Sequence, residues 1–491
     1  MSVELPSRSQ KSHYNSKIRT PKGRKRCSGL VNVNTTQNSE KDERSDLREE
    51  SCIQKFRLKE EHFTKDDEQI LKHFDFYHGF LPREDLFLLV KYVGDYLLRV
   101  SEIDNDTTKI RRDIILSVST EQNPDKSGTK DSNSIGEGGK LGKLKNVVIR
   151  KRGRKYLIET HRFFDSLHEL MEFYKKNSGT LNRFTFMLKN PIKRQSWEYL
   201  HTDVKQGELL GKGAFGEVHA GKLQLKSGEI VEVAIKVHKG CSDLSKAKIK
   251  EMMKEARLMR NFNHRNIVRI YGVAVDEQPI YILLELVTGG ALNSFLKSNA
   301  GQVEVRDKIM MCHGAAQGVE YLHDQRCMHR DLAARNCLIT NDKVVKISDF
   351  GLSRMGTVYT IRASMRLPIK WLAPETITAY TFSLKTDVFS FGVVVFEIFS
   401  DGAEPWEGRT NAEVKIAVVN GEFVKLPMCC PEPLRSFFAN KVFTKDPACR
   451  ANMTDVVAAF ERAACPHAPS EASRLRRKVL GFVSIPRLSS L

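Results

Sequence analysis

The sequence predicts a multidomain α+β protein, in which a small antiparallel sheet flanked by two helices precedes a larger unit of two lobes. The first unit is indicated by the strand-like segments "GDYLLRVSE", "RRDIILSVS", "NVVIR" and "KYLIET" and by the amphipathic helical pattern "DSLHELMEFYKK". The second unit begins with strand-like segments around a glycine cluster and continues with helical patterns such as "DKIMMCHGAAQGVEYLH". A β-rich lobe followed by an α-rich lobe predicts a site in the crevice between them.

The first unit is predicted to span residues 75–190. Its residues 121–143 are rich in Gly, Ser and Lys, which predicts a flexible surface insertion between two strands. The helix in "DSLHELMEFYKK" is expected to begin at a cap formed by Asp165 or Ser166. Residues 191–203 are predicted to be a linker to the second unit.

Both ends of the chain are polar and basic. Residues 1–74 are predicted to be a disordered or loosely helical arm and residues 466–491 a basic tail, because neither sustains an apolar period. The net charge of +19 is concentrated partly in these ends, which favours solvated arms over a nucleic-acid partner. Contact with anionic lipid is the weaker alternative. The 10 cysteines lack C-x-x-C spacing, and neither a signal peptide nor a membrane span is apparent, so we expect free thiols and a cytoplasmic protein.

Near its start, the second unit contains a glycine motif and a lysine that are typical of phosphate binding. Gly211, Gly213 and Gly216 form G-x-G-x-x-G, which lets a backbone approach phosphates closely. A strand follows this motif, whereas a dinucleotide-binding fold requires a helix there. Lys236 lies further on in the apolar strand "VAIK" and is expected to reach the same phosphates, although a lysine on a strand is usually a solvated charge.

The helical segment "KIKEMMKEARLMRNF" offers a carboxylate to hold Lys236. Glu251 and Glu255 lie four residues apart on one helical face. We favour Glu255, because it lies against the apolar stripe that would face the lobe interior, and keep Glu251 as the alternative.

A third group of polar residues lies in "MHRDLAARNCL" and "ISDFG". Asp331 suits a carboxylate that orients an attacking hydroxyl, whereas Asp349 and Asn336 suit oxygen ligands of magnesium across phosphates. Each residue alone would be an ordinary turn residue or cap. Their occurrence after the glycine motif and Lys236 favours phosphoryl transfer.

Residues 204–465 resemble a protein kinase catalytic domain. The resemblance is carried by "GKGAFGEV", "VAIK", "HRDLAARN", "DFG" and "APE" in family order. It implies ATP with Mg²⁺ or Mn²⁺ as cofactors, and catalytic roles for Lys236, Glu255, Asp331, Arg335, Asn336 and Asp349. The ATP-binding residues it implies are Leu210, Gly211, Lys212, Gly213, Ala214, Phe215, Gly216, Glu217, Val218, Lys236, Leu284 and Glu285.

The stretch after Asp331 resembles tyrosine kinases. Ala333, Ala334 and Arg335 stand where serine/threonine kinases typically have a lysine, and "PIKWLAPE" is also of the tyrosine-kinase type. The resemblance therefore implies protein tyrosine as the phosphate acceptor.

The first unit resembles an SH2 (Src-homology-2) module, on the basis of "FYHGFLPRED" and "GDYLLRVSE". Arg99 is expected to bind the phosphate of a phosphotyrosine through two parallel hydrogen bonds, with Ser101 and Arg83 as further donors. An arginine among apolar strand residues is costly to bury without an anion, which favours this pocket over a surface charge. Asn146 replaces a histidine common in the family's pocket wall.

An SH2-like unit directly before a tyrosine kinase, together with "RNIVRIYGV" and "QPIYILLELVTGG", is most similar to the Fes/Fer branch of non-receptor tyrosine kinases. The F-BAR/coiled-coil region of that branch has no counterpart here, so curvature sensing is not expected. The implied partners are protein tyrosine substrates and phosphotyrosine-containing proteins, with a monomeric chain in the cytoplasm or peripherally at the inner face of the plasma membrane.

Tyr359 is the expected regulatory tyrosine and autophosphorylation site. Once phosphorylated, it would carry nearly two negative charges and pair with Arg330 and Arg354. Glu375 and Arg450 are expected to form a buried pair that braces the large lobe.

Two other functions are compatible with parts of the sequence. A catalytically silent kinase fold acting as a scaffold behind the SH2-like unit is the main alternative, although no catalytic residue is missing. A nucleic-acid-associated protein acting through the basic arms is disfavoured, because no recognition motif is present.

Overall fold

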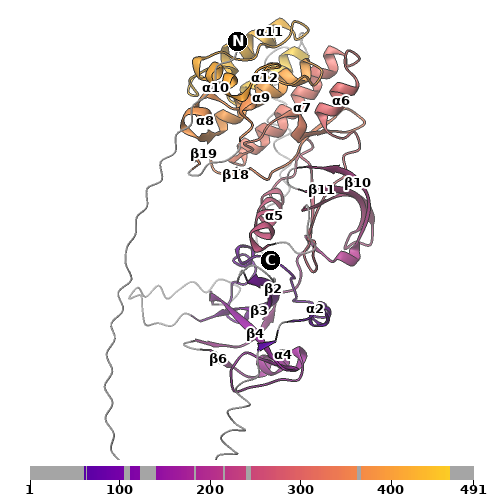
Figure 1. The fold of residues 1–491 in the computed structure, drawn as a ribbon, viewed down its shortest axis with the longest axis vertical. Coiled ribbons are helices and arrows are strands. Elements are labelled where there is room, and N and C mark those ends of the chain that lie inside the picture. The colour runs from indigo at the N-terminus through magenta and orange to yellow at the C-terminus, as the bar shows by residue number, and fades with distance from the viewer. Residues whose placement is uncertain are drawn as a thin grey trace, which may run out of the picture. The chain divides into compact units, whose positions relative to one another are not determined.

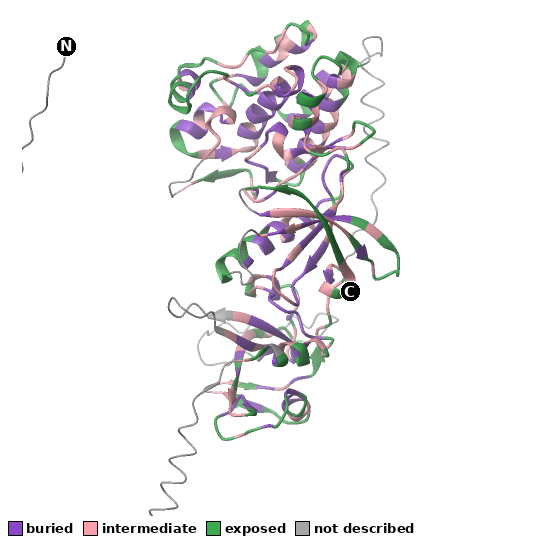
Figure 2. Ribbon diagram, turned by 45° about the vertical axis from the view of Figure 1, so that its right-hand side comes forward, coloured by how far each residue is buried: buried purple, intermediate pink, exposed green. Residues whose placement is uncertain are grey.

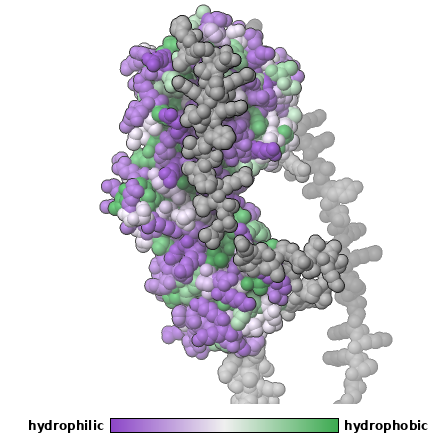
Figure 3. All heavy atoms as spheres, turned by 180° about the vertical axis from the view of Figure 1, so that it is seen from behind, coloured by the Kyte–Doolittle hydropathy of each residue, from purple (hydrophilic) through white to green (hydrophobic). Residues whose placement is uncertain are grey.

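The computed structural model describes residues 60–61, 63–103, 111–121, 140–181, 184–213, 216–238, 245–361 and 367–464. Most of residues 1–74 and 121–143, all of 466–491, and Ala214 and Phe215 lie outside these ranges. Among the described helices, none has the length and apolar character needed to cross a bilayer. The face drawn in Figure 3 mixes hydrophilic and hydrophobic residues.

The first unit is built on a mainly antiparallel sheet with the strand order β1-β4-β3-β2-β8, in which β8 pairs with β2 in parallel and β5 pairs with β4. The strands are β1 (Glu60–Glu61), β2 (Asp95–Ile103), β3 (Arg111–Thr120), β4 (Lys143–Arg152), β5 (Lys155–Leu157) and β8 (Asn190–Pro191); β6 (Gly179–Leu181) and β7 (Phe184–Phe186) form a separate hairpin. Successive residues Leu97, Leu98 and Arg99 of β2 are all buried, so both faces of this strand are covered.

Three helices accompany this sheet: α2 (Lys65–Lys72), α3 (Arg83–Leu86) and α4 (Leu167–Lys176). Ser166, one of the two predicted caps, accepts a hydrogen bond from the backbone N–H of Glu169 at 3.1 Å. α4 buries Leu167, Leu170, Met171 and Tyr174, which lie on one face at helical spacing.

The predicted boundary of the disordered arm at residue 74 is wrong, because α2 lies inside that range. Thr64 and Asp67 form a reciprocal capping box at its start. Asp67 also accepts hydrogen bonds from Lys151 of β4 and from Tyr156, and Leu71 is fully buried. The ordering of this polar helix therefore depends on residues far along the chain. The predicted insertion also ends earlier than expected, since β4 already begins at Lys143.

The predicted linker is part of the folded structure. Within it, β9 (Glu198–Tyr199) pairs in parallel with a strand of the second unit, and the 3₁₀ turn η2 (His201–Asp203) follows. Glu198 is buried, and its carboxylate lies 2.8 Å from Nδ1 of the buried His78 of the first unit. Such contacts fix the connection, in contrast to a free tether.

The β-rich lobe of the second unit is a six-stranded sheet of order β10-β11-β12-β14-β13-β9. Its strands are β10 (Val204–Lys212), β11 (Glu217–Gln224), β12 (Ile230–Val237), β13 (Ile270–Ala274) and β14 (Tyr281–Glu285), with β9 at the edge. Helix α5 (Lys246–Met259) lies beside these strands (Figure 1). Its buried residues include Ala256 and Met259 of the predicted apolar stripe, together with Met252 and Met253, whereas Leu258 of that stripe is half-buried.

The remainder of the second unit is mainly helical, as predicted. The helices are α6 (Leu292–Ser298), α7 (Val305–Asp324), α8 (Pro374–Ala379), α9 (Leu384–Phe399), α10 (Asn411–Asn420), α11 (Glu432–Phe437) and α12 (Met453–Ala464). The short strands are β15 (Cys327–Met328), β16 (Cys337–Ile339), β17 (Val345–Ile347), β18 (Arg354–Met355), β19 (Val358–Thr360) and β20 (Thr381–Ser383), and the turns are η3 (Ala334–Asn336), η4 (Ile369–Trp371) and the π-helical η5 (Phe438–Val442). α9 is buried along most of its length, and Figure 2 shows the buried segments inside this lobe.

Candidate active site

A cleft of about 660 Å³ is lined by residues of both lobes of the second unit. It brings together most of the predicted nucleotide-binding and catalytic residues: Leu210, Gly211, Lys212, Gly213, Gly216, Val218, Lys236, Glu255, Leu284, Glu285, Asp331, Arg335, Asn336 and Asp349. Glu217 does not line the cleft. Its carboxylate lies 3.2 Å from Nζ of Lys212, and its neighbour Val218 occupies the cleft-facing position, as strand alternation requires.

The glycine motif forms the turn between β10 and β11. The backbone N–H of Gly213 donates to the carbonyl of Gly216 at 2.8 Å. A Cβ at Gly216 would lie 2.1 Å from the carbonyl oxygen of Val237, so a side chain there would clash with the next strand. A Cβ at Gly211 would meet no atom within 4 Å, so glycine there leaves open space above the cleft. The motif therefore combines close packing with room for a bound group.

Lys236 of β12 is held by two carboxylates. Its Nζ lies 2.8 and 3.0 Å from the two oxygens of Glu255 and 3.4 Å from Oδ1 of Asp349. Burial acts to lower the pKa of Lys236, but both carboxylates oppose it and leave the pKa above its ordinary value. The ammonium group is therefore charged at neutral pH. Glu255 is the partner, as predicted, whereas Glu251 is exposed.

The carboxylate of Asp331 is held by hydrogen bonds from two residues that lie four and five positions later in the chain. Its carboxylate accepts hydrogen bonds from Arg335 at 2.7 Å and from the Asn336 amide at 2.8 Å. The Arg335 guanidinium lies over the ring of Trp371, 4.4 Å from its centre. The indole N–H of Trp371 donates in turn to buried Glu397 of α9 at 3.0 Å. This chain of contacts fixes the direction of the Asp331 carboxylate.

Asp387 of α9, which the sequence analysis missed, supports the backbone of the same loop. Its carboxylate accepts from the backbone N–H groups of His329 at 2.7 Å and Arg330 at 2.9 Å. Arg330 has a positive φ of 71°, and these bonds stabilise a conformation that is unfavourable for a side-chain-bearing residue. The available signal was a carboxylate at the start of the otherwise apolar helix "KTDVFSFGVVVF".

Asp349 presents an ionised carboxylate to the cleft. Burial acts to raise the pKa of Asp349, but the charges of Lys236 and His329 and a hydrogen bond from Gly351 lower it below its ordinary value. Asn336 donates its amide N–H to Asp331, which leaves the amide oxygen as an acceptor. Asp349 and Asn336 thus offer oxygen ligands that suit Mg²⁺, a metal that is commonly held by one or two protein oxygens together with substrate phosphates. No cluster of three His, Cys, Asp or Glu side chains that would hold a metal by itself occurs in the described part of the chain.

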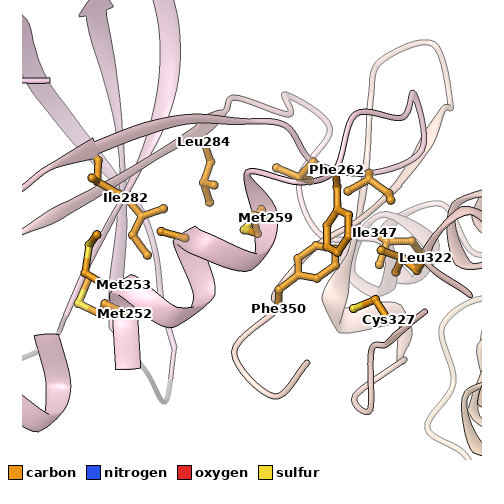
Figure 4. Close-up of a cluster of buried hydrophobic side chains, with 14 of the residues drawn as sticks. Met252, Met253, Met259, Phe262, Ile282, Leu284, Leu322, Cys327, Ile347 and Phe350 are labelled. Atoms are coloured by element: carbon orange, nitrogen blue, oxygen red, sulfur yellow. The ribbon is translucent and has the colours of Figure 1, made fainter. Parts of the chain in front are cut away.

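An apolar cluster lies between the elements that carry the site residues. Figure 4 shows Met259 of α5, Phe262 and Phe350 among the buried side chains beside Leu284. The rings of Phe262 and Phe350 are 5.5 Å apart, and Phe350 also contacts the His329 ring at 5.2 Å. The residue after Asp349 is therefore packed against the segment that follows α5 and against the loop that carries Asp331.

The walls of the cleft include apolar residues that motif reasoning did not identify. They are Ala234, Met259, Val268, Leu286, Val287, Ala291 and Leu338. Ala234 and Leu338 lie on strands and Met259 on α5, whereas the other four lie outside these elements. Only apolar character marks them in the sequence, and that signal is shared by any core residue. They provide a surface for a flat apolar ring.

Tyr359 lies close to both arginines that are expected to bind it once it is phosphorylated. The Arg330 guanidinium is 4.6 Å and that of Arg354 6.0 Å from the Tyr359 ring centre. Burial and the charges of Arg354 and Arg330 lower the pKa of Lys254 to about 8, which identifies this α5 lysine as a further member of the cluster. Nε of Arg330 is buried without a hydrogen-bond partner among the described residues. The cluster carries excess positive charge.

Arg99 occupies a second cavity, of about 370 Å³, in which Arg83, Ser101 and Asn146 are also lining residues. Arg99 is only 6% exposed, and it donates to Oγ of Ser117 and to the Asn146 amide oxygen, both at 3.2 Å. Burial and the nearby charge of Arg83 lower the pKa of Arg99 to about 10. Among the described residues its hydrogen-bond partners are neutral and it forms no ion pair, although Glu84 also lines the cavity.

Comparisons with known proteins agree with this geometry. A family model for protein tyrosine and serine/threonine kinases matches residues 204–460. The transforming tyrosine-protein kinase Fps of avian sarcoma virus (strain PRCII) is 34% identical over 72% of this chain and 61% of its own length. Human tyrosine-protein kinase Fer is 34% identical over 75% of this chain but 41% of its own length. Fer-related kinase 1 of Caenorhabditis elegans is 31% identical over 78% of this chain and 92% of its own. The chain spans less than two thirds of the length of the first two relatives.

Proposed function

Because the chain belongs to the protein tyrosine and serine/threonine kinase family and is a Fes/Fer-like member of it, we propose that it transfers the γ-phosphoryl group of ATP to tyrosine side chains of proteins. The observation that carries this proposal is the meeting of Lys236, Asp331 and Asp349 in one cleft. A magnesium ion held by Asp349 and Asn336 would neutralise charge that develops on the phosphates.

Each protein group has a distinct task in this proposal. The Lys236 ammonium, fixed by Glu255, binds phosphate oxygens, and the glycine turn covers them with backbone N–H groups. The Asp331 carboxylate accepts a hydrogen bond from the acceptor hydroxyl and orients its oxygen toward the phosphorus atom. Catalysis then rests on positioning and charge stabilisation by groups that are already held in place.

Tyrosine is favoured as the acceptor by the surroundings of Asp331. Arg335 reaches Asp331 while it lies over Trp371, so the side of the loop that meets the acceptor is built from a planar cation and an indole. A phenol ring can pack against such a surface and bring its hydroxyl to Asp331, whereas the shorter serine side chain gains less contact there.

The proposal is tested with the purified full chain, ATP, magnesium and matched peptide mixtures that offer tyrosine, serine or threonine as acceptors. We expect phosphate on the tyrosine peptides, detected by mass spectrometry, and a rate on serine and threonine that is at least about a hundred-fold lower. Mass spectrometry of the digested full chain from the same reaction tests for phosphate at Tyr359, where autophosphorylation would place an anion among Arg330, Arg354 and Lys254. Incorporation on serine would contradict the assigned acceptor, and no incorporation on any peptide would favour the scaffold alternative.

We also propose that the first unit is an SH2 module that binds phosphotyrosine-containing proteins through Arg99. Such binding would hold phosphorylated partners near the cleft and raise their effective concentration. The buried guanidinium with neutral neighbours supports this role, because a phosphate dianion would supply the missing countercharge and accept two parallel hydrogen bonds.

Replacing Arg99 by leucine should weaken phosphotyrosyl-peptide binding by about a hundred-fold or more, because at least two charge-assisted hydrogen bonds are lost. Binding is measured by calorimetry on the full chain, with Arg154→Leu as the control, since Arg154 is exposed and lies outside the cavity. Equal affinity of the Arg99 variant and the wild type would rule out this pocket.

A further inference from the structure

The cavity around Arg99 is not lined by the first unit alone. Lys246, Ile249 and Lys250, all from the first two turns of α5 in the second unit, also line it. Helix α5 is the element that carries Glu255 toward Lys236, and no motif singled out its first turns. Two lysines of the kinase lobe therefore share a cavity with Arg83 and Arg99.

Specific contacts seat α5 against the first unit. Asp85 of α3 is 3% exposed, and its carboxylate accepts from Arg257 at 2.6 and 2.8 Å and from Arg260 at 3.1 Å. The backbone N–H of Phe80 donates to the carbonyl of Val275 at 2.8 Å. A Cβ at Gly79 would lie 1.9 Å from that same carbonyl oxygen, so this close approach requires glycine. The cavity wall formed by α5 thus has a fixed position.

The charges around the cavity are unevenly neutralised. Lys250 lies 2.5 Å from the Glu84 carboxylate, so its charge is already balanced. Lys246 and Arg83 have no carboxylate within ion-pair distance among the described residues, and Arg99 bonds only to neutral oxygens. The cavity is therefore lined by four cations, Arg83, Arg99, Lys246 and Lys250, and by one carboxylate, that of Glu84, which is paired with Lys250.

The start of α5 adds to the positive electrostatic potential of the cavity. A helix N-terminus favours acidic residues, because its free backbone N–H groups carry partial positive charge. The first turn of α5 contains no acidic residue, Lys246 and Lys248 occupy it instead, and Ser245 makes no side-chain capping bond. Such an arrangement is unfavourable by itself and becomes favourable when an anion binds beside it.

We propose that Lys246 is a phosphate-binding residue of the phosphotyrosine pocket, so that the site is composite and its ligand contacts both the SH2 module and the kinase helix α5. The ligand class is a phosphotyrosyl peptide, whose phosphate lies on Arg99 and extends its contacts to Lys246. This inference rests on the proposed phosphotyrosine-binding function of the first unit, and it adds a binding residue from the other domain.

The test compares Lys246→Ala with Lys248→Ala in the full chain. Both variants remove one exposed lysine charge from the first turn of α5, but only Lys246 lines the cavity. Phenyl phosphate, titrated by phosphorus NMR, probes the phosphate contact without peptide sequence, and a phosphotyrosyl peptide probes the complete ligand. We expect Lys246→Ala to weaken both about five- to ten-fold and Lys248→Ala to weaken them less than about two-fold.

Two further measurements, the affinity for inorganic phosphate and the ligand affinity of Arg99→Leu, distinguish the remaining outcomes. Inorganic phosphate that binds as tightly as phenyl phosphate would identify a general anion site and overturn the phosphotyrosine assignment. Equal weakening by the two lysine variants would mean that they act only through the general positive potential of the helix start, and it would overturn the role of Lys246. In that case, loss of binding in Arg99→Leu would still leave the SH2 proposal intact. Unchanged binding in Arg99→Leu would instead remove the pocket itself, and with it the composite site.

Discussion

Replacing Asp331 by asparagine should lower the rate of peptide-tyrosine phosphorylation by about a thousand-fold, while the protein stays folded and still binds ATP with magnesium. The carboxylate accepts hydrogen bonds from Arg335 and Asn336 and has a free direction toward the cleft. An asparagine side chain has almost the same shape, but it removes the negative charge and turns one acceptor into a donor. The acceptor hydroxyl then loses the group that orients it.

Steady-state rates with a tyrosine peptide measure this effect, and nucleotide affinity is measured separately by calorimetry. Asp342→Asn is the matched control, because Asp342 is exposed in the turn between β16 and β17. A rate within ten-fold of wild type in the Asp331 variant would contradict the proposed role. A joint loss of rate and nucleotide binding would point instead to a disturbed cleft.

The sequence predicted which polar residues line the cleft better than it predicted the residues that surround them. Lys236, Asp331 and Asp349 were identified because phosphoryl transfer needs these residue types at recognisable points of a strand and two loops. The choice of Glu255 over Glu251 followed from the apolar stripe of one helix, which is a local pattern. Local patterns of this kind are visible in a single sequence.

What the sequence did not predict depends on contacts between distant segments. The sequence of helix α2 resembles a polar arm because its hydrogen-bond partners, Lys151 and Tyr156, lie more than eighty residues away. Asp387 and Lys246 have no motif of their own, and each reaches its position only when α9 or α5 packs against another element. Glu217 was assigned to the cleft by its place in a motif, although strand alternation directs it away.

Replacing Arg450 by methionine should destabilise the second unit by about 3–5 kcal/mol, because the change leaves a partly buried carboxylate and two carbonyl groups without their donor. The Arg450 guanidinium is fully buried and donates to the two oxygens of Glu375 at 2.6 and 3.1 Å, as the sequence analysis predicted. It also donates to the backbone carbonyls of Lys385 at 2.8 Å and Thr444 at 2.9 Å, and lies over the ring of Phe389.

Thermal unfolding measures this loss, and a midpoint lowered by roughly 6–12 °C corresponds to the lower end of the range. Glu375→Gln is a useful comparison, because it keeps an acceptor for Arg450 and removes only the charge. The double variant Arg450→Met/Glu375→Met should be less destabilised than the sum of its single variants, since it leaves neither charge buried alone. Strict additivity would mean that the two side chains stabilise the lobe independently, and the backbone carbonyls that Arg450 binds would then account for most of its contribution.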